Sequence, residues 1–292
     1  WPSRFFAGII RIPGALSNSR EEIVRSATLL CILIALACWT AMARADSPPD
    51  LRAAGVFGDG QHNDTTALQQ VINEAAQART PLQIPAGTYL IDASIGLTIP
   101  SHSRIELAPE AILKAIPNSI DHTQILKINQ VSDVHLSGGQ IEGDRQQHRG
   151  KTGEWGHGID IRASGQITIR GTIIRQCWGD GIYIGSNTQD AQILDVVCRE
   201  NRRQGLSVTS GSQILIQGCT FEKTSGTPPA CGVDVEPNRG ESVLNCSIVK
   251  CRFLANAGGA IQAGPATRDQ GLAFVKDLRI ENCRLEDNGE GV

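Results

Sequence analysis

Apolar residues recur along this chain in a repeated pattern. Between Leu136 and Leu285, six segments share the same order: an apolar residue, two spacers, a residue of modest size, one spacer and a second apolar residue. The segments begin at Leu136, Ile169, Ile193, Ile216, Ile248 and Ile280, at intervals of 33, 24, 23, 32 and 32 residues. Repetition at such intervals is typical of stacked repeats, and short alternating strands within each repeat predict a β-solenoid.

A second pattern follows most of these segments, a glycine and then an apolar, a variable and an apolar residue. Copies lie at Gly158–Ile161, Gly181–Ile184, Gly205–Val208 and Gly232–Val235, with a looser one from Gly259. Alternate side chains of a strand point to opposite faces, so the variable residue and the one after the pattern should face outward. We expect one outward column of Asp160, Tyr183, Ser207 and Asp234, a second of Arg162, Gly185, Thr209 and Glu236, and an edge row of His157, Asp180, Gln204 and Cys231.

One segment has a helical period instead. Leu68, Val71, Ile72 and Ala75 follow Asp64 at helical spacing, which predicts an amphipathic helix over about 65–78 with Asp64 at its start. A helix laid across the first coil of a solenoid covers the apolar interior there.

Three motifs at the start of this region carry a family resemblance. Phe57–Gly60 (FGDG), Asn63–Gln69 (NDTTALQ) and Ile84–Tyr89 (IPAGTY) resemble the amino-terminal signature of the pectate lyase-like superfamily, which includes rhamnogalacturonases, alginate epimerases and phage tailspikes. Over about 55–292 the resemblance implies an all-β fold, a right-handed parallel β-helix with three strands per coil and an N-terminal capping α-helix. It does not select a reaction, because this scaffold carries hydrolases, lyases, epimerases and binding proteins.

The amino-terminal region is typical of a secretory signal at residues 24–45. Arg25 is followed by an apolar run and by the small-x-small sequence Ala43–Ala45. A membrane anchor is the alternative, although the run is short for a bilayer span. We expect residues 1–23 to be an upstream extension and 46–292 to be one β-helix domain, secreted or periplasmic, with no stable membrane span after cleavage. Because Gly291–Val292 begins another strand pattern, we also expect the native protein to continue beyond it.

Net charge and cysteine positions limit which partners, metals and disulfides are expected. A net charge of −3 and a pI near 6.1 do not favour nucleic acid, and no cysteine or histidine spacing suggests zinc. Cys219, Cys251 and Cys283 share one inward repeat position, with Cys198 beside it, which predicts a buried ladder of free thiols. Cys177, Cys231 and Cys246 fall outside this register, where disulfide pairing remains open.

The outward columns gather the residues that favour carbohydrate chemistry. The insertions 142–155 and 222–231 border this face, so they could wall a groove for an acidic polysaccharide. We take the carboxylates Asp180, Asp234 and Glu236 as candidate catalytic residues. The candidate substrate-binding residues are His157, Asp160, Tyr183, Trp178, Arg202 and Arg203, and Trp155 also borders the groove.

Two reactions fit these residues. In glycoside hydrolysis Asp180 and one of Asp234 or Glu236 would form the acid–base pair; their spacing of two coils, roughly 10 Å, is nearer the inverting than the retaining geometry. In β-elimination, Ca²⁺ held by Asp160, Asp234 and Glu236 would neutralise a uronate, with Arg203 or Arg162 as base. No cofactor is otherwise expected.

Comparison with the motifs of two families in this superfamily argues against two specific activities. Polygalacturonases carry an Asp-Asp-Cys motif where this chain has Gly179 and Asp180, and the Tyr-Gly-Phe-Asp-Pro-His-like motif of alginate epimerases is absent. A uronan epimerase and a non-catalytic, adhesive glycan-binding protein are the alternative functions.

Overall fold

Parallel strands make up nearly all regular structure in residues 50–265 and 272–289, the part of the chain that the computed structural model describes. The predicted upstream extension, the signal at 24–45 and the terminal Gly291–Val292 lie outside the described residues. The first strands are β1 (Asp59–Asn63), β2 (Leu82–Ile84), β3 (Gly87–Ile91), β4 (Leu97–Thr98), β5 (Arg104–Ala115), β6 (His122–Asn129) and β7 (Ser132–Glu142).

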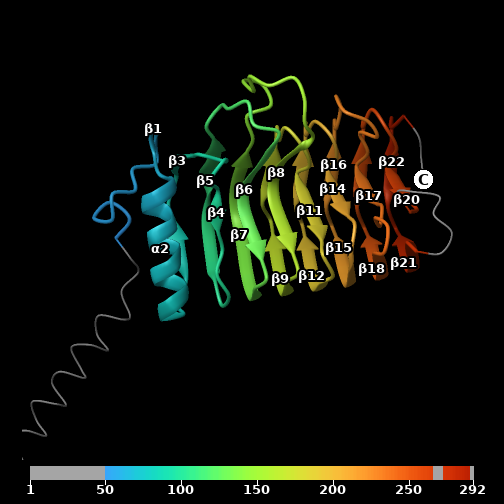
Figure 1. Ribbon diagram of the computed structural model, residues 1–292, viewed down its shortest axis with the longest axis horizontal. Helices are drawn as coiled ribbons and strands as arrows, with labels where there is room; N and C mark the ends of the chain where they lie inside the picture. Colours follow the sequence, from blue (N-terminus) through green and yellow to red (C-terminus); the bar gives the residue numbers. More distant parts are fainter. Residues whose placement is uncertain (1–49, 266–271, 290–292) are drawn as a thin grey trace, which may run out of the picture. The chain divides into compact units, whose positions relative to one another are not determined.

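From β8 onward the chain repeats in coils of three strands. The coils are β8 (Trp155–Arg162), β9 (Gly165–Arg170) and β10 (Ile173–Arg175); β11 (Ile182–Gly185), β12 (Thr188–Leu194) and β13 (Val197–Arg199); β14 (Leu206–Val208), β15 (Gly211–Gln217) and β16 (Thr220–Glu222); β17 (Val233–Val235), β18 (Ser242–Val249) and β19 (Arg252–Leu254); β20 (Ile261–Ala263), β21 (Phe274–Glu281) and β22 (Arg284–Glu286). Each strand pairs in parallel with its equivalent one coil on, as Figure 1 shows. The β-solenoid predicted from the repeats is confirmed, as are the three strands per coil that the family resemblance implies.

Among the described residues the strands form two sheets. Seven strands lie side by side in the order β20-β17-β14-β11-β8-β6-β4, and this seven-stranded sheet carries the Gly-apolar-x-apolar repeats. The other fifteen strands join through β7, which pairs with β9 at its start and β10 at its end. The first residues of the six-residue repeats are in register, with Ile193 paired to Ile169 on one side and Ile216 on the other.

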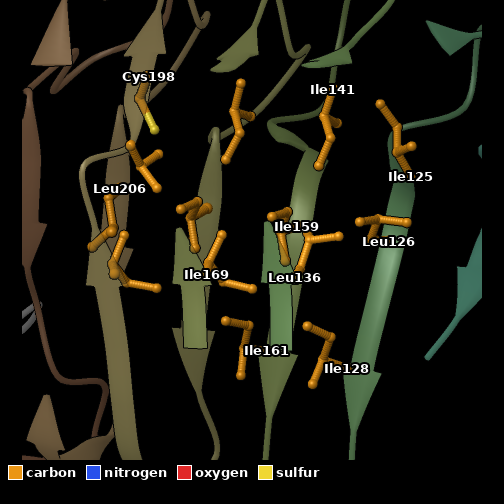
Figure 2. Packing of buried hydrophobic residues seen from close by; sticks show 14 of the residues in the cluster. Ile125, Leu126, Ile128, Leu136, Ile141, Ile159, Ile161, Ile169, Cys198 and Leu206 are labelled. Carbon is orange, nitrogen blue, oxygen red and sulfur yellow. The ribbon is translucent and has the colours of Figure 1, made fainter. Parts of the chain in front are cut away.

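The interior is a set of aliphatic stacks. Leu126 pairs with Ile159 and Ile128 with Ile161, and Figure 2 shows these side chains next to one another in successive coils. All four are at most 1 % exposed, and burying such a side chain contributes roughly 1.5–3 kcal/mol. The alternation inferred for the seven-stranded sheet is therefore present.

The cysteines join this interior. Cys219 and Cys251 are 1 % and 2 % exposed, and each donates its thiol to a backbone carbonyl of the preceding coil, Ile193 and Ile216. Cys283 is half-buried. Cys177 and Cys246 are buried free thiols, so a disulfide at either position is not formed. Cys231 is buried with its thiol directed at the Pro229 carbonyl.

Helix α2 (Thr65–Ala78) has the predicted bounds and covers one end of the stack (Figure 1). Leu68, Val71 and Ile72 are buried against the core. Asp64 occupies the N-cap position, but its carboxylate accepts the N–H groups of Phe57 (2.7 Å) and Gly58 (3.1 Å) instead of capping the helix. No helix within residues 50–265 and 272–289 is long and apolar enough to cross a membrane.

Candidate functional site

The outward face of the seven-stranded sheet brings the predicted columns together. Tyr183 pairs with Asp160 on one side and Ser207 on the other, and Ser207 pairs with Asp234. These residues therefore stand one above another in four successive coils. The register follows from the spacing of the glycine repeats, because each repeat enters its strand at the same point.

Asp180 and Asp234 lie beneath the surface of this face, with exposures of 0 % and 1 %. The sequence pattern placed Asp234 in an outward column and Asp180 in the edge row, and neither position indicated this burial. The Asp180 carboxylate accepts hydrogen bonds from Ser207 Oγ (2.9 Å) and Arg203 Nη1 (3.2 Å), and that of Asp234 accepts one from Gln204 Nε2 (2.7 Å). The side chains that bind these two carboxylates, Ser207, Arg203 and Gln204, all come from the coil between them.

The two aspartates lean toward each other. Asp180 precedes β11 and reaches forward to Ser207 on β14, whereas Asp234 on β17 reaches back to Gln204, which precedes β14. Both carboxyl groups thus approach the coil between them. The two-coil backbone spacing of roughly 10 Å overestimates their separation.

Arg203 lies at the centre of the acidic residues. Its guanidinium is 3.2 Å from Asp180 Oδ2, 3.4 Å from Glu154 Oε2 and 4.0 Å from Glu236 Oε2. We call Arg203, Asp180, Glu154, Glu236 and Asp234 the Arg203 cluster. Glu154 was missed by sequence reasoning, since it belongs to the insertion 142–155 and to no repeat position.

Burial sets the protonation of these acids. Burial raises the pKa of Asp180 to about 6, against the charge of Arg203 and the hydrogen bond from Ser207. Burial, and next the charge of Glu236, raise the pKa of Asp234 to about 7. Carboxyl groups that titrate near neutrality, close together on one face, are typical of functional sites.

His157 supports the site from below. Its side chain is fully buried, its Nδ1 accepts the backbone N–H of Asp180 at 3.2 Å, and its ring stacks on Tyr183 with centroids 5.1 Å apart. Burial, and then the charges of Arg162 and Arg203, lower the pKa of His157 to about 3. The ring is therefore neutral, and it holds the Asp180 backbone rather than facing a substrate.

A second group of side chains in contact on this face consists of Asp160, Arg162 and Tyr183. Arg162 Nε donates to Asp160 Oδ2 at 3.0 Å, and its guanidinium carbon lies 4.2 Å from the centre of the Tyr183 ring. The Tyr183 hydroxyl and Thr209 Oγ1 are 2.8 Å apart. Burial raises the pKa of Asp160, although Arg162 opposes this.

A cavity of about 260 Å³ opens above these side chains. It is bounded by polar residues of successive coils and one tryptophan: His122, Gln124, Trp155, Arg162, Tyr183, Arg203, Thr209, Glu236 and Asn238. Of the residues that the sequence predicted for the site, five reach the cavity: Trp155, Arg162, Tyr183, Arg203 and Glu236.

Trp178 and Arg202 lie elsewhere. The Trp178 ring stacks with His148 (3.9 Å between centroids) and with the Arg202 guanidinium (3.8 Å), and its Nε1 donates to the Thr152 carbonyl. Arg202 also donates to the Gly153 carbonyl at 2.6 Å. Both residues anchor the insertion 142–155, and the tryptophan of the cavity is Trp155, which is 39 % exposed.

The proposed calcium ligands do not form one site. Asp160 and Asp234 are three coil steps apart, roughly 14 Å, whereas Ca²⁺ ligands all lie about 2.3–2.6 Å from the ion. In the part of the chain that the structure describes, no group of three or more His, Cys, Asp or Glu side chains could hold a metal ion. Asp160, Asp234 and Glu236 therefore do not fit a shared calcium ion.

Comparisons with known proteins agree with this architecture. The uncharacterised protein YclG of Bacillus subtilis (strain 168) is 30 % identical over 243 residues, 71 % of this chain and 42 % of its own length. Mannuronan C5-epimerase AlgE2 of Azotobacter vinelandii is 26 % identical over 254 residues, 82 % of this chain and 24 % of its own. The chain thus spans less than half the length of these curated relatives.

A solved structure shares the fold. PfbA, a surface adhesin of Streptococcus pneumoniae, superposes with a TM-score of 0.56 at 14 % identity, over 84 % of this chain and 79 % of its own. The family model described as the right-handed β-helix region matches residues 120–292. Since that match covers more than half of the residues and the coils have the architecture it describes, the chain belongs to the right-handed β-helix family.

Proposed function

We propose that this protein binds an acidic polysaccharide on the outward face of the seven-stranded sheet and cleaves it with the carboxyl groups of the Arg203 cluster. The observation that carries the proposal is the position of Asp180, Asp234 and Glu236 around one arginine, beside a cavity, with two of the three pKa values raised toward neutrality. Such an arrangement supplies both an acid and a base at neutral pH.

The arginines support the acidic class of substrate. Arg203 and Arg162 both line the cavity, and a planar guanidinium matches a carboxylate. The contact of Arg203 with Glu236 is long, 4.0 Å, so the carboxylate of a uronate competes with Glu236 for this arginine. The similarity to mannuronan C5-epimerases, whose name states an acidic polymer as substrate, supports the same class.

Glu236 is the carboxylate that a bound sugar would contact. Its side chain is 27 % exposed and lines the cavity. Asp234 lies two residues earlier on the same strand face, and its pKa near 7 leaves it partly protonated at neutral pH. In hydrolysis Glu236 would contact the sugar and activate water or attack it. Asp234, which is 1 % exposed, would supply the proton to the glycosidic oxygen once the Gln204 side chain that holds it moves aside.

Elimination uses the same residues differently. Arg203 would neutralise the uronate carboxylate, and Glu236 would remove the proton beside it, while Asp234 protonates the leaving oxygen. Both reactions shorten the polymer, but only elimination creates an unsaturated end.

A binding protein without catalysis is the second candidate. The observation that favours it is the burial of Asp180 and Asp234, each held by hydrogen bonds from the neighbouring coil. In that case the cluster would serve to orient Arg203, and the predicted export of the chain would place it against extracellular glycans.

The test is incubation of the full chain with alginate, pectate and neutral polysaccharides. We expect reducing ends to appear with an acidic polymer, and ultraviolet absorbance of the product separates elimination from hydrolysis. Glu236→Gln and Asp234→Asn are the matched inactive variants. Binding without any shortening of the polymer would leave the second candidate, and neither binding nor shortening would reject the proposal.

A further inference from the structure

Trp155 and His122 form a flat aromatic pair at the cavity. Their ring centroids are 4.2 Å apart and their planes differ by 8°. Both residues line the cavity, and Trp155 stays 39 % exposed. The pair is thus a rigid apolar surface among polar side chains, the combination that suits the C–H face of a pyranose ring.

The β-helix itself holds this pair in place. Trp155 is the register partner of His122, one coil apart on β8 and β6. In-register neighbours on one face of parallel strands keep their side chains stacked, and the backbone N–H of Trp155 donates to the Asp121 carbonyl at 3.3 Å. The backbone register therefore places the indole beside the His122 ring without a ligand.

Trp155 is also close to the arginine that would bind a carboxylate. Glu154, its neighbour in the chain, is 3.4 Å from Arg203 Nε. Both Trp155 and Arg203 lie at the edge where the strands of the sheet begin, two coils apart, roughly 10 Å. An apolar surface and a cation at this distance contact one sugar or two adjoining sugars.

We propose, resting on the function proposed above, that the site recognises its glycan in two separable parts. The Trp155–His122 pair holds a sugar ring by its apolar face whatever its charge, and Arg203 holds the uronate carboxylate. Selectivity for acidic polysaccharides then comes from Arg203, whose contact with Glu236 is long, rather than from Arg162, which is paired with Asp160 at 2.9 Å. Trp155 contributes equally to the binding of acidic and neutral rings.

The contrast with Trp178 strengthens this assignment. Trp178 is covered by His148 and by the Arg202 guanidinium and does not line the cavity. The chain therefore offers a matched control, a second tryptophan of the same region that serves only to anchor the insertion.

The experiment measures binding rather than turnover. The probes are hexasaccharides of alginate and of pectate, each beside its carboxyl-reduced, neutral counterpart, with the full chain and calorimetric affinities. Trp155→Ala should lower the affinity for an acidic hexasaccharide and the affinity for its reduced counterpart by the same factor, about tenfold. Trp155→Phe should restore most of this loss, and Trp178→Phe should change neither affinity.

Arg203→Gln supplies the other half of the test. It should weaken the binding of the acidic probe far more than the binding of the reduced probe, so that the preference for the acidic probe is lost. Binding of a hexasaccharide should also shift the tryptophan fluorescence of the parent to shorter wavelength, and this shift should be absent in Trp155→Phe.

The outcomes separate the two proposals. If Arg203→Gln abolishes acidic binding while Trp155→Ala changes no affinity, the aromatic subsite is wrong and the proposed function stands. If Trp155→Phe fails to restore binding, the loss in Trp155→Ala is structural and the subsite is again wrong. If no hexasaccharide binds the parent protein, both proposals are wrong.

Discussion

Two clusters of opposite charges on this β-helix differ in how deeply their aspartates are buried. On the fifteen-stranded sheet, Asp133 is 2.9 Å from His102 Nδ1, 2.6 Å from Arg104 Nη2 and 3.6 Å from His135 Nε2. In the Arg203 cluster one arginine likewise contacts several partners. The Asp133 side chain is 31 % exposed, however, whereas that of Asp180 is fully buried.

The difference reverses the direction of the pKa shift. Hydrogen bonds from His102 and Arg104 lower the pKa of Asp133. Burial raises the pKa of Asp180 to about 6 although Arg203 lies 3.2 Å away. Pairing alone therefore makes an ordinary surface ion cluster, while pairing combined with burial makes a group that exchanges protons near neutrality.

The largest expected effect comes from removing the central arginine. Arg203→Gln should lower the free energy of unfolding at pH 8 by about 3–5 kcal/mol, because the buried charge of Asp180 loses its partner. Arg104→Gln, the matched change beside Asp133, should cost less than about 1 kcal/mol. Urea denaturation measures both, and equal costs would contradict the distinction between the clusters.

The pH dependence of stability sharpens the same contrast. The folded pKa of Asp180 lies above its ordinary value, so the folded state binds the proton more tightly than the unfolded state between pH 4 and 6. Asp180 therefore contributes about 3 kcal/mol to the free energy of unfolding below pH 4, and this contribution is lost as pH rises through 6. Asp180→Asn should remove that part of the slope.

The pKa shift of Asp133 on folding has the opposite sign. Its pKa is lowered on folding, so its contribution is present at neutral pH and is lost only as pH falls below its ordinary range. Urea denaturation of Asp133→Asn should remove part of the loss of stability as pH falls below about 4. A change of slope between pH 5 and 8 reports His135 instead, because burial lowers the pKa of that histidine and the Asp133 charge opposes this lowering. An unchanged loss of stability below about pH 4 would contradict the assigned sign.

Turnover is the next test, on whichever polymer the parent shortens. Asp234→Asn and Glu236→Gln should each reduce turnover by at least about 10²-fold, the usual scale for losing an acid or base. Asp133→Asn should leave turnover unchanged. Nearly normal rates in both site variants would move catalysis away from the seven-stranded sheet.

The smallest effect is expected at Glu154, which belongs to the Arg203 cluster but is exposed like Asp133. Its side chain is 33 % exposed and 3.4 Å from Arg203. Glu154→Gln should change the free energy of unfolding by less than about 1 kcal/mol, and added salt should erase the difference. A cost near that of Arg203→Gln would show that membership of the cluster matters more than burial.

Much of the fold follows from local patterns. The helix at 65–78, the inward register of Ile159 and Ile161, and the buried position of Cys219 all came from the spacing of apolar residues. Strand alternation also predicted the column that joins Asp160, Tyr183 and Asp234. These features depend on neighbours in the chain, and a repeat copies them from coil to coil.

The site was only partly predictable. Glu154 lies in an insertion outside the repeats, so no register indicated that it would reach Arg203. Trp155 was predicted to border the groove, and it lines the cavity. Trp178 carries the same apolar ring as Trp155 in the sequence, but His148 and Arg202 cover it. Nothing local distinguishes the two tryptophans, because the covering groups come from distant segments.

The sequence by itself determined which residues face outward, since the strand period of two and the glycine repeats set that for every coil. Only the tertiary structure decided which outward side chains are buried. Asp180 and Asp234 are covered because Ser207, Gln204 and Arg203 of the coil between them fold over their short side chains. Such coverage depends on side-chain length and on the stacking of coils, and it raises two carboxyl pKa values that the sequence alone would have left ordinary.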